Sequence, residues 1–145
     1  MDLFEILNNP TADWLREKPA RETAIQRLIE NTGLHFPEEY LNFLGYSDGG
    51  EGELAVQPLW FHIFAAEEAI YKNKSYQLDE YLPGYFAFGN NMGLEIFVFN
   101  IQESPPWKVY YVPNIGMEEE AVLECAPNFL AFIKAMGHPS ELEGN

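Results

Sequence analysis

The stretch that decides the fold class is Gly89-Asn90-Asn91-Met92-Gly93-Leu94-Glu95-Ile96-Phe97-Val98-Phe99. Residues 89–93 are rich in types that tolerate a left-handed backbone, and they separate two apolar segments at 85–88 and 94–100, a pattern that predicts a β-hairpin. Residues 96–99 are all apolar, as in a central strand covered on both faces. Residues 107–112 add the next strand, so we expect an antiparallel meander.

Amphipathic segments flank this region on both sides. Residues 21–32 predict a helix that stops at Gly33, a second helix begins with Pro37 at its first position, and a closing helix opens at Pro127 and Asn128 and ends at Gly137. Their expected buried faces are Ala24, Ile25, Leu28 and Ile29; Tyr40, Leu41 and Leu44; and Phe129, Phe132, Ile133 and Met136. Helices, an antiparallel sheet and a closing helix predict an α+β fold, a central antiparallel β-sheet with helices packed against it.

Between the second helix and the hairpin, residues 48–52 are dense in glycine and predict a turn. Short apolar segments at 54–56 and 60–64 predict strands, and residues 67–72 predict a short helix. Trp60 and Trp107 lie at strand ends, where we expect core packing with part of the indole able to reach the surface. We expect one domain over residues 1–145, with an N-terminal extension at 1–19 and a C-terminal tail at 137–145.

The charge is strongly negative, with a formal net value of −15. A chain that is 47% hydrophobic folds, so this charge decorates a folded surface and repels phosphate groups. We therefore expect no binding to nucleic acid or to a membrane. No Lys or Arg occurs between residues 31 and 71, where seven acidic residues lie. A solubilising surface is one interpretation of this pattern, and a surface for a basic protein is another.

The cellular compartment is suggested by the single cysteine and by the N-terminus. Cys125 has no partner for an internal disulfide, and the first residues lack the basic segment of a secretory signal. No window is apolar enough to span a membrane. These features predict a cytoplasmic protein.

The strongest hint of catalysis is Gly45-Tyr46-Ser47-Asp48-Gly49, which matches the G-x-S-x-G pattern of hydrolases. That pattern needs a strand before the serine and a helix after it, whereas here a helix is predicted before Ser47 and a turn after it. The three histidines are far apart in sequence, and the acidic turn lacks the ligand spacing of a calcium loop. We therefore expect no catalytic residues, no metal and no cofactor. One alternative stays open, a small-ligand or metal-binding enzyme on the sheet face around His62, Glu95 and Tyr110.

Four segments in order resemble the SUKH superfamily, which includes bacterial immunity proteins and fungal regulators of cell-wall assembly. The first is Phe36-Pro37-Glu38-Glu39-Tyr40-Leu41-Asn42-Phe43-Leu44 with the turn Ser47-Asp48-Gly49-Gly50-Glu51-Gly52, and the second is the hairpin quoted above. The others are Val109-Tyr110-Tyr111-Val112-Pro113 and Cys125-Ala126-Pro127-Asn128-Phe129-Leu130-Ala131-Phe132-Ile133. The resemblance implies a protein that acts by occluding a partner, often a secreted nuclease toxin.

Charge and resemblance together predict a non-enzymatic immunity protein that neutralises a toxin domain through an acidic surface. A nuclease needs a basic surface to hold phosphate, and an acidic protein competes for that surface. The candidate contact residues are Asp48, Glu51, Glu53, Trp60, Glu67 and Glu68, and also Glu95, which lies in an otherwise apolar strand and could instead face an edge or a buried partner. The alternative is a regulatory or scaffold protein of the same fold with a cellular partner that is not a toxin.

Overall fold

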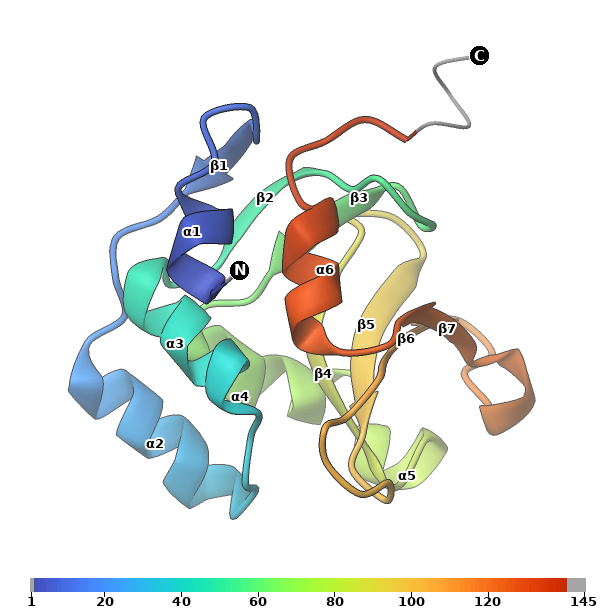
Figure 1. Cartoon of the computed structure of the whole chain (residues 1–145). Coiled ribbons are helices and arrows are strands. Elements are labelled where there is room, and N and C mark those ends of the chain that lie inside the picture. The colour runs from blue at the N-terminus through green and yellow to red at the C-terminus, as the bar shows by residue number, and fades with distance from the viewer. Residues whose placement is uncertain (1, 141–145) are drawn as a thin grey trace.

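A computed structural model describes residues 2–140, in which seven strands form one antiparallel sheet. Their order in the sheet follows their order in the chain, so each strand pairs with the next one. The strands are β1 (Trp14–Arg16), β2 (Gly50–Glu53), β3 (Trp60–Ile63), β4 (Tyr85–Asn90), β5 (Glu95–Asn100), β6 (Val109–Pro113) and β7 (Leu123–Ala126). The predicted α+β fold with a central antiparallel sheet is confirmed (Figure 1).

Short-range signals mark the end of α2 and the start of α6. The chain forms α1 (Leu3–Leu7), α2 (Glu22–Thr32), α3 (Glu38–Tyr46), α4 (Ala66–Ser75), α5 (Leu78–Tyr81) and α6 (Phe129–Ala135), with a 3-10 turn at Glu119–Ala121. Gly33 follows α2 in a left-handed conformation with φ 68°, as predicted. Asn128 caps α6, because its side chain accepts a hydrogen bond from the Ala131 N–H. None of the helices within residues 2–140 is long and apolar enough to cross a membrane.

The core is built of aromatic rings between the sheet and the helices α3 and α6. Phe88 of β4 lies at its centre, with its ring centroid 4.6 Å from that of Phe99 and 5.4 Å from that of Phe132. Tyr40 of α3 and Phe129 of α6 pack against the same ring. All four residues from 96 to 99 are fully buried, which confirms the prediction of a central strand covered on both faces.

The glycine-rich segment 48–52 is only in part the predicted turn. Gly50 and Gly52 belong to β2, and both lie directly beneath the side chain of Trp14. A Cβ atom at Gly52 would be 2.7 Å from the Cβ of Trp14, which is closer than two carbons can approach. These glycines therefore serve close packing between β1 and β2, a need that is visible only when Trp14 is placed.

Two further predictions in this region need correction. Residues 54–56 do not form the expected strand, because the residues that pair with β3 are those of β2, Gly50–Glu53. Of residues 54–56, only Leu54 takes part in a β-bridge, an isolated one with Met136. Trp60 is 38% exposed, whereas Trp107 is buried as expected. The difference follows from alternation along β3, since Phe61 faces the core and Trp60 faces outward.

The segment expected as an N-terminal extension contains α1 and β1. β1 pairs with β2 over three residues, and the Asp13 N–H donates to the carbonyl of Gly137 at 2.9 Å. Residues 3–16 are thus packed into the sheet and against the end of α6. Of the tail predicted from residue 137, residues 141–145 lie outside the described part of the chain.

Candidate functional site

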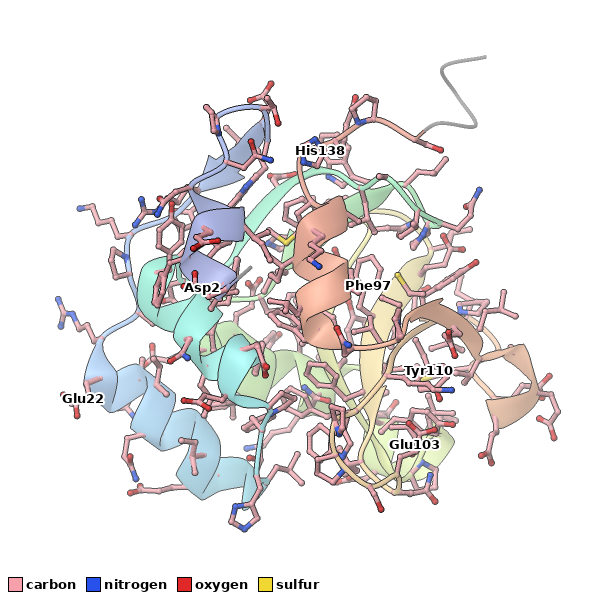
Figure 2. The ribbon with its side chains drawn as sticks, viewed as in Figure 1. Asp2, Glu22, Phe97, Glu103, Tyr110 and His138 are labelled. Carbon is pink, nitrogen blue, oxygen red and sulfur yellow. The ribbon has the colours of Figure 1, made fainter. Side chains whose placement is uncertain are left out.

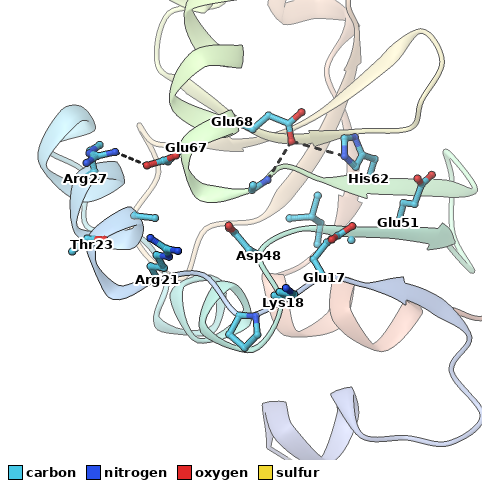
Figure 3. A pocket seen from close by; sticks show the side chains of 15 residues that line it. Glu17, Lys18, Arg21, Thr23, Arg27, Asp48, Glu51, His62, Glu67 and Glu68 are labelled. Carbon is cyan, nitrogen blue, oxygen red and sulfur yellow. Dashed lines mark hydrogen bonds and ion pairs between the residues drawn. The ribbon is translucent and has the colours of Figure 1, made fainter.

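A hollow of about 760 Å³ lies between the N-terminal ends of α2 and α4 and the start of β2 (Figure 3). We call it the groove. Four of the predicted contact residues line it, namely Asp48, Glu51, Glu67 and Glu68. The groove also contains basic residues that sequence reasoning missed, namely Lys18, Arg21 and Arg27. The segment without Lys or Arg is therefore flanked by cations from an earlier part of the chain, and the groove carries both signs of charge.

Asp48 holds the start of α4 in place. Its Oδ1 accepts a hydrogen bond of 2.8 Å from the Ala66 N–H, one of the free amides at the beginning of that helix. Burial raises the pKa of the Asp48 carboxyl, the Ala66 N–H opposes this shift, and the nearby charges of Glu67, Glu17 and Glu68 add to it. Asp48 thus joins the α3–β2 connection to α4, which is a structural task.

We expect Asp48→Ala to lower the free energy of unfolding by about 1–2 kcal/mol, because it leaves the Ala66 amide without its cap. Asp48→Asn keeps an acceptor oxygen, so its loss should be smaller. The raised pKa of Asp48 in the folded state means that its contribution to stability is present at low pH and declines as pH rises above about 4. Urea unfolding at several pH values measures this, and a wild type that does not lose stability relative to Asp48→Asn on raising the pH would contradict the assignment.

Glu67 and Glu68 are also engaged within the chain. Glu67 forms an ion pair with Arg27 of α2, and Glu68 accepts a hydrogen bond of 3.3 Å from the Ala65 N–H. Glu68 also lies 3.9 Å from the Nε2 atom of His62. These contacts link α2 and β3 to the first turn of α4. The two glutamates are therefore less free to bind a partner than their charge alone suggested.

Glu51, Glu53 and Trp60 lie together on the outward face of β2 and β3. Glu53 is paired with Trp60 across the two strands, and Glu51 is paired with His62. The Trp60 Nε1–H donates to Oε2 of Glu51 at 3.3 Å. The three residues also line a second hollow of about 440 Å³ beside β1, which we call the β1–β3 hollow. These are the predicted residues that the structure leaves accessible as a group.

Glu95 is separate from the other candidates. It is the first residue of β5, and its Oε1 accepts a hydrogen bond of 2.7 Å from the side-chain amide of Asn91. Asn91 in turn accepts from the Glu95 N–H at 3.1 Å. This reciprocal pair closes the β4–β5 hairpin. Glu95 lines neither the groove nor the β1–β3 hollow.

The serine of the hydrolase-like pattern is a structural residue. Ser47 is fully buried directly after α3, donates to the carbonyl of Gly49 at 2.6 Å and accepts from the Glu17 N–H at 2.9 Å. A helix precedes it and a glycine turn follows, which confirms its interpretation as a helix-end residue. Burial, and secondly the charge of Glu124, raises the pKa of the Cys125 thiol to about 12. The thiol is therefore not activated as a nucleophile.

The residues of the alternative enzyme site have separate partners. The Tyr110 hydroxyl donates to Glu103 at 2.6 Å (both side chains are labelled in Figure 2). His62 lies near Glu68, and Glu95 bonds to Asn91. Within residues 2–140, no group of three His, Cys, Asp or Glu side chains is placed to hold a metal ion. The structure thus does not bring these three residues together as one site.

The family follows from a match over most of the folded chain. A family model described as SMI1 / KNR4 family (SUKH-1) matches residues 19–135. The chain belongs to this family. Membership is consistent with a protein-binding module of the immunity or regulatory kind, and SUKH proteins are generally non-enzymatic. A search of curated proteins found no match. The SUKH match includes all seven candidate residues and begins after α1 and β1.

Proposed function

We propose that this SUKH protein is an immunity protein that neutralises a cognate bacterial toxin in the cytoplasm by occluding it with an acidic surface. The observation that carries the proposal is the outward face of β2 and β3, where, within residues 2–140, no Lys or Arg forms an ion pair with Glu51 or Glu53 and Trp60 is exposed beside them. An exposed indole is a typical anchor at a protein interface, and carboxylates beside it give charge complementarity to a basic partner.

The toxin's basic substrate-binding surface supplies the complementary charge. A nuclease must present Lys and Arg to phosphate, so a protein of net charge −15 gains association rate by electrostatic steering and then blocks the substrate. The engaged residues Asp48, Glu67 and Glu68 support this surface by holding α4 and β2 in position. In this proposal, Glu51, Glu53 and Trp60 make the contact itself.

The test reverses two charges, in the variant Glu51→Lys/Glu53→Lys. An immunity gene is expected to lie directly downstream of its toxin gene, so the toxin domain encoded there is co-expressed with the chain, and its affinity is measured by calorimetry. We expect the double variant to lose protection and its Kd to rise about 100-fold, because repulsion replaces attraction at the contact.

The matched control is Glu118→Lys/Glu120→Lys, which makes the same change in net charge at two exposed residues with the same spacing. It should protect fully, with a Kd within about fivefold of wild type, since remote charges act mainly on the association rate. Full protection by Glu51→Lys/Glu53→Lys would overturn the proposal. If no toxin gene lies beside the gene of this chain and the chain captures a cellular protein instead, the result would favour the regulatory alternative.

A further inference from the structure

The β1–β3 hollow differs from the groove in the sign of its charges. Three carboxylates line it, from Asp13, Glu51 and Glu53, and no Lys or Arg of the described chain is among its lining residues. Its apolar part includes Trp60 and Leu15, which are 38% and 67% exposed. The hollow is therefore an apolar surface bordered only by negative charge.

The indole of Trp60 is held at one edge by a hydrogen bond, and the side chain is partly exposed. Its Nε1–H donates to Glu51, which fixes the ring relative to β2, and Glu53 stands opposite it across the strand pair. A cation over an exposed indole gains from the ring's negative face, and neighbouring carboxylates add direct charge attraction. Trp60, Glu51 and Glu53 thus form an arrangement that favours a cation.

Among residues 2–140, no Lys or Arg lines the hollow to supply this cation. Arg16 is the basic residue of β1, but its guanidinium lies 3.6 Å from the ring centroid of Tyr46 and donates to the Tyr46 carbonyl at 2.9 Å. Arg16 is thereby committed to α3. The same contact shows, within this molecule, how a guanidinium stacks on an aromatic ring and hydrogen-bonds beside it.

We infer that the β1–β3 hollow receives an arginine side chain of the partner protein, with its guanidinium on Trp60 and its N–H groups directed to Glu51 and Glu53. This inference rests on the proposed function, because it names the contact that a basic partner makes. Arginine fits better than lysine, since a planar guanidinium stacks on an indole while its fork donates to two carboxylates, whereas an ammonium is a compact and strongly hydrated charge. In this arrangement, the apolar side chain of Leu15 lies beside the aliphatic part of the partner's arginine.

The first test uses two peptide probes of equal length and charge, one with arginine and one with lysine at alternating glycine positions. We expect the wild-type chain to bind the arginine peptide at least about fivefold more tightly than the lysine peptide at low salt. Trp60→Ala should abolish this preference, and Glu51→Gln/Glu53→Gln should weaken both peptides while keeping the shape of the surface. Tyr71→Ala removes another exposed aromatic side chain, on α4, and should change neither the preference for arginine nor the affinity for either peptide.

The second test separates this inference from the proposed function by using the co-expressed toxin domain. Trp60→Ala is expected to raise the toxin Kd about 50-fold, with an unchanged circular dichroism spectrum. Equal binding of the two peptides by the wild type, or a preference that survives in Trp60→Ala, would overturn the arginine site. Toxin protection that persists in Trp60→Ala but is lost in Glu51→Lys/Glu53→Lys would also overturn it while leaving the immunity proposal standing. An arginine preference in a chain that binds no toxin would support the arginine site and overturn the immunity proposal.

Discussion

Gly49→Ala is expected to lower the free energy of unfolding by about 3–4 kcal/mol. Gly49 has φ 99°, a backbone conformation that residues other than glycine rarely adopt. A Cβ atom there would be 2.6 Å from the carbonyl oxygen of Ile63 and 3.2 Å from the Ala65 nitrogen, both main-chain atoms that cannot rotate away. Urea unfolding followed by tryptophan fluorescence measures the loss.

Gly116→Ala is the matched control for this prediction. Gly116 also has a positive φ, 68°, but an added Cβ would meet nothing within 4 Å. Its loss should be only about 1 kcal/mol, the cost of the left-handed conformation. Equal losses at the two positions would contradict the steric explanation. Because Gly49 lies between the Asp48 cap and strand β2, its variant should also weaken partner binding, whereas the Gly116 variant should not.

Phe88→Ala is expected to cost about 4 kcal/mol, because it removes the ring at the centre of the aromatic core. The ring centroids of five aromatic residues lie within 4.6–6.0 Å of it, namely Tyr40, Phe97, Phe99, Phe129 and Phe132. These rings come from α3, β5 and α6. Loss of the Phe88 ring therefore weakens the packing of both helices against the sheet. The drop in the urea midpoint measures this loss of stability.

Two further variants test whether packing is the cause. Phe88→Leu keeps most of the apolar volume and should lose about 1.5 kcal/mol. Phe4→Ala removes a phenylalanine that is 50% exposed on α1, and its loss should stay within about 1 kcal/mol. Losses of similar size at Phe88 and Phe4 would show that burial between the sheet and the helices does not govern stability here.

Much of the fold was predictable because its signals are local. A left-handed Gly33 ends α2, the Asn128 side chain caps α6, and an uninterrupted apolar run forms β5. Short elements with few apolar residues were missed, above all β1 and β7. Both are edge strands that form by pairing with a neighbour, and pairing leaves little pattern in three or four residues.

The candidate site was predicted in part. Charge clustering selected Glu51 and Glu53, and a position at a strand end selected Trp60 as an apolar anchor; strand alternation does bring these three residues to one face. Charge clustering also selected Asp48, Glu67 and Glu68, which the structure engages in capping α4 and in pairing with Arg27. Asp13, Leu15 and the basic residues of the groove were missed, because they reach these positions only through the pairing of β1 with β2 and of α2 with α4.

The sequence by itself determined the α+β class and the excess of negative charge, since hydrophobic period, caps and composition act over a few residues. Only the tertiary structure decided which carboxylates are free. A side chain's partners depend on contacts between segments that lie 18 to 40 residues apart, such as Asp48 with Ala66 and Arg27 with Glu67. An acidic stretch of sequence therefore became two surfaces, a groove of mixed charge that holds α4 and a negative, tryptophan-bearing sheet face.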